Sequence, residues 1–271
     1  MSSAYSLLTA FGLLGAALSS GETPSLRVCS DPNNMPFSNK QQKGFENRIA
    51  KLFAKDLGME VSYFWFPQRA SFFQQTLNNG VCDVVMGVPS GFDEAETTRP
   101  YYRSSYVFVS RRTDKLHITS FDDPRLRTLK IGVNILGDGD DSLPPVHALT
   151  KRGIVRNLVG YSIFGNLEKA NPSAALIAAV AKRDVDVAIV WGPLGGSFAR
   201  ASKVPLDVTP IDKDSANPEL PLTFDICMGV REGDTKLKDL LNRELAQRHA
   251  EIENILRSYG IPEAAVSIAE R

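Results

Sequence analysis

Short polar side chains follow the first apolar, strand-like run of the sequence. The run that ends at Cys29 continues into Ser-Asp-Pro-Asn-Asn-Met-Pro-Phe, which supplies Asp31, Asn33, Asn34 and Phe37. Carboxylate and amide groups held between two prolines suit ligand binding, because a stiff loop loses little entropy when it binds. An ordinary turn rich in proline and asparagine is the alternative interpretation of this segment.

Further candidate ligand-binding residues come where other strand-like runs end. Several are aromatic rings that carry polar handles, which suit a binding surface. A single ring of this kind belongs more often to a core, so it is their shared position at strand ends that makes them candidates. The remaining candidates are Trp65, Arg69, Pro89, Ser90, Gly91, Tyr101, Tyr102, Asn134 and Trp191.

No pattern in the sequence predicts a catalytic centre or a metal site. The chain has no GxSxG, P-loop or HExxH motif, and its three histidines are far apart. The acidic run 137–142 lacks the alternation and the distant glutamate of a calcium loop, so we expect a solvated loop there. We therefore expect a protein that is not an enzyme and that carries neither a metal nor a cofactor.

Three cysteines, Cys29, Cys82 and Cys227, are too few for a disulfide framework. Each lies in an apolar run, where a free cysteine usually behaves as a small hydrophobic residue. One pair could be bridged in an oxidising compartment, and the sequence does not choose which pair.

Composition excludes several classes of protein. The 271 residues carry 31 basic and 31 acidic side chains, so no basic excess supports nucleic-acid binding. Residues 7–18 are apolar or small and have the length of a signal-peptide core, whereas a membrane span needs about 18 apolar residues. We expect residues 1–20 to be a signal peptide, with no membrane insertion after its removal and a periplasmic location. A buried N-terminal helix is the alternative.

Strand and helix patterns alternate along the chain from Leu26 onward. This alternation predicts mostly parallel sheets with right-handed crossovers. The first cycle has strands at Leu26–Cys29, Val61–Phe66 and Val81–Met86 and helices at Lys43–Leu57 and Arg69–Asn79. The second has strands at Leu129–Val133, Leu158–Tyr161 and Val185–Val190 and helices at Val146–Arg152 and Pro172–Ala181. Strands at Tyr106–Ser110 and Phe224–Val230 and a helical tail at Thr235–Tyr259 complete the pattern.

Two such cycles predict an α/β protein with two lobes, a hinge and an interlobe cleft. We expect lobe 1 at 21–111, lobe 2 at 112–218 and a return to lobe 1 at 219–271, with crossings near Tyr106–Thr113 and Glu219–Asp225. Ligands in open α/β sheets bind beyond the carboxyl ends of the strands, so the facing lobes would place them in the cleft.

Segments spread over nearly the whole chain resemble the methanol-oxidation J-protein family (MxaJ/XoxJ), which is similar to type II periplasmic solute-binding proteins. The segments are CSDPNNMPFSN, GFENRIAKLFAKDLG, CDVVMGVPSGFD, TTRPYYRSSYVFV, PPVHALTKRGIV and DVDVAIVWGPLGG. The resemblance implies a periplasmic, non-catalytic accessory protein. Its implied partners are a PQQ-dependent methanol or alcohol dehydrogenase and the associated cytochrome c.

The sequence departs from the amino-acid-binding relatives of this family at both of their anchor points. Those relatives are expected to hold the ligand carboxylate with an arginine shortly after the third strand, where this chain has the acidic stretch Phe92–Glu96. They place an aspartate for the ligand amine where this chain has Trp191. Arg69, Arg99 and Arg103 remain as candidate substitute clamps.

Three functions follow from this comparison. The first is an accessory protein that uses an aromatic cleft to bind or mature the dehydrogenase. The second is the substrate-binding protein of an ABC uptake system for a small solute. The third is a dehydratase-like enzyme on the same fold, for which Asp31, Asp93 and Asp138 are the only acids near the cleft, none with an evident partner.

Overall fold

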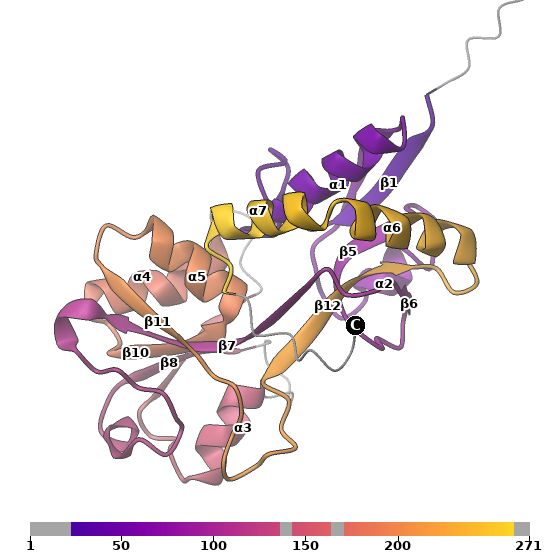
Figure 1. Ribbon diagram of the computed structural model, residues 1–271. Helices are drawn as coiled ribbons and strands as arrows, with labels where there is room; N and C mark the ends of the chain where they lie inside the picture. Colours follow the sequence, from indigo (N-terminus) through magenta and orange to yellow (C-terminus); the bar gives the residue numbers. More distant parts are fainter. Residues whose placement is uncertain (1–22, 136–142, 164–170, 263–271) are drawn as a thin grey trace, which may run out of the picture.

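The computed structural model describes residues 23–135, 143–163 and 171–262 and shows two α/β lobes side by side (Figure 1). The expected signal peptide and the acidic run 137–142 lie outside these residues. In the described part of the chain, no helix has the length and apolar character that crossing a membrane requires.

The first lobe is built on a sheet with the strand order β4-β1-β5-β12. β1 lies between β4 and β5 and is parallel to both, as the βαβ pattern predicts. Its strands are β1 (Ser25–Ser30), β4 (Glu60–Trp65), β5 (Val84–Pro89), the short β6 (Glu96–Thr97) and β12 (Thr223–Val230). Its helices are α1 (Phe45–Asp56), α2 (Phe72–Gln75), α6 (Thr235–Gln247) and α7 (His249–Tyr259). A small hairpin, β2 (Asn33–Asn34) with β3 (Ser38–Asn39), follows β1.

The second lobe repeats the arrangement with the strand order β9-β8-β10-β7, and β11 also pairs with β7. β8 is parallel to both β9 and β10, so the first strand of the lobe is again central. The strands are β7 (Tyr102–Arg111), β8 (Ile131–Ile135), β9 (Leu158–Ser162), β10 (Val187–Trp191) and β11 (Leu206–Pro210). The helices are α3 (Pro144–Lys151), α4 (Ala175–Lys182) and α5 (Gly192–Ala201), with short 3-10 turns at Arg112–Asp114, Pro124–Arg127 and Pro172–Ala174.

Two antiparallel strands, β7 and β12, connect the lobes (Figure 1). The first four residues of β7, Tyr102–Ser105, pair with β12, and the residues from Tyr106 onward pair with β10 and β11. Between these two strands, the Arg103 Nη1 atom lies 3.5 Å from the Asp225 Oδ2 atom. The domain boundaries expected from the sequence remain a prediction.

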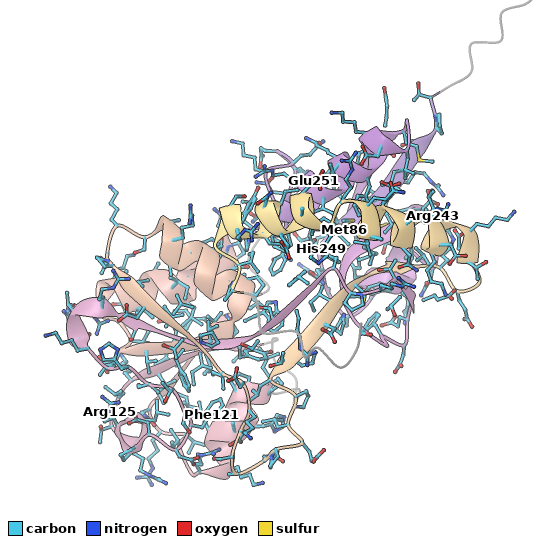
Figure 2. The ribbon with its side chains drawn as sticks, viewed as in Figure 1. Met86, Phe121, Arg125, Arg243, His249 and Glu251 are labelled. Atoms are coloured by element: carbon cyan, nitrogen blue, oxygen red, sulfur yellow. A yellow bond between two sulfur atoms is a disulfide. The ribbon has the colours of Figure 1, made fainter. Side chains whose placement is uncertain are left out.

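Each lobe has its own hydrophobic core on both faces of its sheet. In the first lobe Met86 lies with residues of α1, α6 and α7, and in the second Phe121 lies with residues of β8 and α3 (Figure 2). Along β7, Tyr106 and Phe108 enter one core of the second lobe while Val107 and Val109 enter the other. This alternation is the two-residue period of a strand covered on both faces.

Most expected elements are present, and the differences have local causes. The helix expected at Arg69–Asn79 is only Phe72–Gln75, because the Thr76 hydroxyl bonds the Phe72 carbonyl and the chain then turns. The helical tail is two helices that meet at Arg248, whose side chain binds Asp56 of α1 at 2.7 Å.

Helix α5 was not expected from the sequence, because glycine disfavours a helix interior. Close packing explains these glycines. A Cβ atom on Gly195 would lie 2.6 Å from the Val107 side chain, and one on Gly196 would lie 2.1 Å from the Gly260 carbonyl oxygen.

A disulfide joins Cys29 of β1 to Cys82, just before β5, and Cys227 is a buried free thiol. The bridge closes a loop with a sequence separation of 53 residues that includes α1, β4 and α2. Such a bridge stabilises the fold mainly by restricting the unfolded chain.

We predict that replacing both Cys29 and Cys82 by serine lowers the free energy of unfolding by about 3 kcal/mol. Urea denaturation without reductant measures the change. Reductant should bring the wild-type protein to the level of the variant and leave the variant unchanged. Peptide mapping that pairs Cys227 with either cysteine would contradict the assignment.

Candidate functional site

The main cavity lies between the lobes and has a volume of about 340 Å³. Asp31 follows β1 and Asn134 lies near the end of β8, and these are the central first strands of the two lobes. Ligands of open α/β sheets bind at such points, where the strand order reverses. The lining residues are Asp31, Asn33, Asn34, Phe37, Pro67, Gln68, Arg69, Tyr106, Asn134, Leu143, Ile163, Pro172, Ser173, Trp191 and Leu194.

Asp31 holds two loops of the first lobe together at this cavity. Its carboxylate accepts the backbone N–H of Asn33 at 2.7 Å and that of Gln68, after β4, at 2.7 Å. The amide of Asn34 donates to the side chain of Gln68 at 3.0 Å. Asp31 therefore positions the cavity wall, which is a structural role that does not depend on any ligand.

The hairpin after β1 also caps α1 and touches the second lobe. The backbone N–H groups of Phe45 and Glu46, in the first turn of α1, donate to carbonyls of Pro36 and Phe37. Gly44 is required here, because a Cβ atom would lie 1.8 Å from the Phe37 oxygen. Across the cleft, the backbone N–H of Asn171 donates to the Asn33 side chain at 3.3 Å.

Trp191 ends β10 and packs against the cores of both lobes. Its ring lies edge-on to Tyr106 at 5.5 Å and to Phe224 at 5.8 Å. The neighbouring indole N–H partly offsets the effect of burial, which raises the pKa of the Tyr102 hydroxyl. Trp191 therefore forms the floor where the lobes meet.

A second, more polar cavity of about 190 Å³ lies beside the first. The two share Asp31, Asn34, Phe37, Gln68 and Trp191. The other lining residues are Cys29, Ser30, Ser38, Glu46, Val85, Met86, Gly87, Tyr102 and Ile226.

Glu46 is the most perturbed acid at this site. It lies in the first turn of α1 and its side chain is 8% exposed. Burial raises the pKa of this carboxyl to about 8, against the opposing effect of the neighbouring Tyr101 hydroxyl. That hydroxyl is itself buried and makes no hydrogen bond of regular geometry. The carboxyl is therefore mostly protonated at neutral pH.

The structure brings together most of the residues proposed from the sequence. Seven line the main cavity, namely Asp31, Asn33, Asn34, Phe37, Arg69, Asn134 and Trp191. Tyr102 lines the second cavity. That these residues bind a ligand remains a prediction.

Five proposed residues line neither cavity. Trp65 stacks on Tyr63 at 4.6 Å, on β4. Tyr101 packs under Tyr102 with its ring centre 5.0 Å away. The segment with Pro89, Ser90 and Gly91 lies along β12, where the Ser90 N–H donates to the Asp225 carbonyl at 2.9 Å. A strand end identifies the edge of a sheet but not the direction in which a side chain points.

Sequence reasoning missed Glu46 and Tyr106. Glu46 follows Phe45 in an amphipathic helix, so the helical period placed Phe45 in the core and gave no reason to bury its neighbour. Its burial results from the hairpin and β5 closing over the first turn, which only the folded chain shows.

The two anchors for a zwitterionic ligand are absent from the described site. Asp93 and Glu94 are exposed and line neither cavity, and Trp191 occupies the second anchor position. Of the candidate clamps, Arg69 is exposed at the cavity wall, Arg103 pairs with Asp225, and Arg99 lies outside both cavities. Within the described residues, no group of three potential metal ligands gathers.

We predict that Glu46→Gln stabilises the protein more at pH 9 than at pH 5. The folded state keeps a proton that the unfolded state releases between pH 4.5 and about 8, so wild-type stability falls as the pH rises through this range. Glu46→Gln removes this loss and should raise the free energy of unfolding at pH 9 by about 5 kcal/mol. Urea denaturation at both pH values measures it, and Glu60→Gln, on the exposed edge of β4, is the control. Equal effects of Glu46→Gln at both pH values would contradict the burial argument.

Comparison with known proteins agrees with this fold. The model of bacterial extracellular solute-binding proteins, family 3, matches residues 26–261. The protein MoxJ of Methylorubrum extorquens is 32% identical over 90% of this chain and 83% of its own length. The crystal structure of the periplasmic binding protein XoxJ from Methylobacterium extorquens AM1 superposes with a TM-score of 0.73 at 37% identity, covering 89% of this chain and all of that one.

A second solved structure, MxaJ from Methlophaga aminisulfidivorans, has a TM-score of 0.74 at 25% identity and covers 88% of this chain and 100% of that one. These matches span both lobes and the connecting strands. The chain therefore belongs to the bacterial extracellular solute-binding proteins, family 3, and within them to the MxaJ/XoxJ family.

Proposed function

We propose that this protein is a periplasmic, non-catalytic accessory factor of a PQQ-dependent methanol or alcohol dehydrogenase system. The cleft between the lobes binds a segment of the dehydrogenase, or holds that enzyme during its maturation. The cytochrome c of the same system is a second candidate partner. Membership of the MxaJ/XoxJ family is the observation that carries this proposal.

The chemistry of the cleft supports a partner that is not a free amino acid. Recognition of a zwitterion needs a cation for the carboxylate and an anion for the amine, at a fixed separation. Here Trp191 replaces the second-lobe anion and acidic residues replace the first-lobe cation. The main cavity instead offers amide groups and rings, which suit side chains of a polypeptide.

Uptake of a small solute is the second candidate function. The main cavity between the lobes and the exposed guanidinium of Arg69 at its wall favour this alternative, since a guanidinium binds anions. A thermal-shift screen discriminates the two, because a small metabolite bound well above its Kd raises the melting temperature by several degrees.

We predict that Arg69→Ala weakens binding of the dehydrogenase by about tenfold, since arginine is enriched among the residues that dominate binding energy and Arg69 lines the main cavity, where a bound segment would cover it. The measurement is biolayer interferometry with the purified PQQ-dependent dehydrogenase of the same organism. Lys236→Ala on α6 removes the same charge from an exposed position outside both cavities and should leave the affinity unchanged.

Two results would count against the accessory role. The first is the absence of any complex between the wild-type protein and either the dehydrogenase or its cytochrome c. The second is equal weakening by both substitutions, which would assign the effect to net charge and not to the cleft.

A further inference from the structure

The second cavity contains a carboxyl group that the protein itself leaves without a charged partner. Only 8% of the surface of Glu46 is exposed, yet the residue lines this cavity. Its Oε1 atom points toward Gly87 of β5, where a Cβ atom would lie 2.4 Å from that oxygen. In the described part of the chain, no basic side chain forms an ion pair with it.

Among the described residues, the titratable groups that interact with Glu46 are three phenols. Tyr63 comes from β4, Tyr101 precedes β7, and Tyr102 belongs to β7. Burial raises the pKa of each of these hydroxyls, so none supplies a charge at physiological pH. Within the described residues, only burial and the Tyr101 hydroxyl act on the pKa of Glu46.

The rest of the cavity wall favours positive charge. Asp31 adds a carboxylate that is oriented by two backbone N–H groups. The rings of Phe37, Tyr102 and Trp191 also line the cavity, and the faces of aromatic rings attract cations. A cavity lined by a buried carboxyl, a carboxylate and three rings is poorly suited to an anion.

We propose that the second cavity is a subsite for one positively charged group, an ammonium or guanidinium, which the carboxyl group of Glu46 holds among these rings. Because the site has no clamp for a carboxylate, the preferred ligand is a monocation and not an amino acid. The inference goes beyond the accessory role and does not depend on any dehydrogenase.

Binding at this subsite is coupled to release of a proton. A cation within a few ångströms of the Glu46 carboxyl favours its ionised form and lowers its pKa. Below about pH 8 the empty protein holds that proton and the occupied protein gives it up. Affinity for a permanently charged ligand therefore rises with pH and levels off above about pH 8.

Calorimetric titration of the full chain with ethylammonium and methylguanidinium chloride tests the proposal at constant ionic strength. The affinity of each cation should increase about tenfold per pH unit from pH 6 to 7, and close to one proton should be released per cation at pH 7. Titrations in two buffers of different ionisation enthalpy measure the proton. Failure of both cations to bind at pH 9, or binding without proton release at pH 7, overturns the proposal.

Three variants assign the effect to Glu46. Glu46→Gln keeps the size of the side chain and should lower affinity at pH 9 at least tenfold and abolish both the pH slope and the proton release. Gly87→Ala intrudes on the carboxyl and should also weaken binding. Glu60→Gln, on β4 and outside the cavity, should behave as the wild type. An unchanged pH slope in Glu46→Gln would reject the subsite even if the cation binds.

The cation could be a free small amine or a basic side chain of a protein partner. Nα-acetyl-lysine amide carries the same ammonium on a polypeptide-like backbone. Binding of this probe at least tenfold tighter than ethylammonium assigns the subsite to a lysine side chain, and the reverse order assigns it to a free amine. These titrations contain no dehydrogenase, so their failure is separate from failure of the proposed function.

Discussion

The antiparallel pairing of β7 with β12 is the constraint on which the remaining structure depends. Residues Tyr102–Ser105 hydrogen-bond to β12, and the next residues of the same strand enter the sheet of the second lobe. The two sheets are therefore continuous through one strand, and the ends of their parallel strands face a common space. Because β7 is covered on both faces in the second lobe, its direction is set by two cores at once.

This pairing also decides which residues can form a binding site. Asp31 and Asn134 belong to different lobes and are far apart in the sequence, yet each follows or ends the central strand of its lobe. Trp191 closes the space between them by packing on the cores of both lobes. The same location that serves small ligands in related folds is thus ring-lined here, and its chemistry differs from that of a zwitterion site.

The protonation state of Glu46 depends on how the surrounding elements bury its carboxyl group. A carboxyl placed in the first turn of a helix gains from the helix dipole, but burial under the hairpin and β5 outweighs this gain. Its protonation is therefore sensitive to any charge that enters the cavity. A stiff hairpin held by Asp31 on one side and by α1 on the other keeps this environment in place.

Local patterns in the sequence determined the order of strands and helices and the residues at the strand ends. Alternation of apolar residues along β7 and the helical period of α1 and α6 are properties of nearby residues, so they could be interpreted without coordinates. The glycine-rich helix α5 could not be predicted in this way. Its glycines are required by close contacts with β7 and with the chain after α7, which are remote in sequence.

Only the tertiary structure decided the composition of the two cavities, the disulfide between Cys29 and Cys82, and the burial of Glu46. The physical reason is that each depends on the distance between segments remote in sequence. The identity and period of neighbouring residues specify which face of an element is apolar, whereas packing of several elements fixes which polar group is enclosed between them.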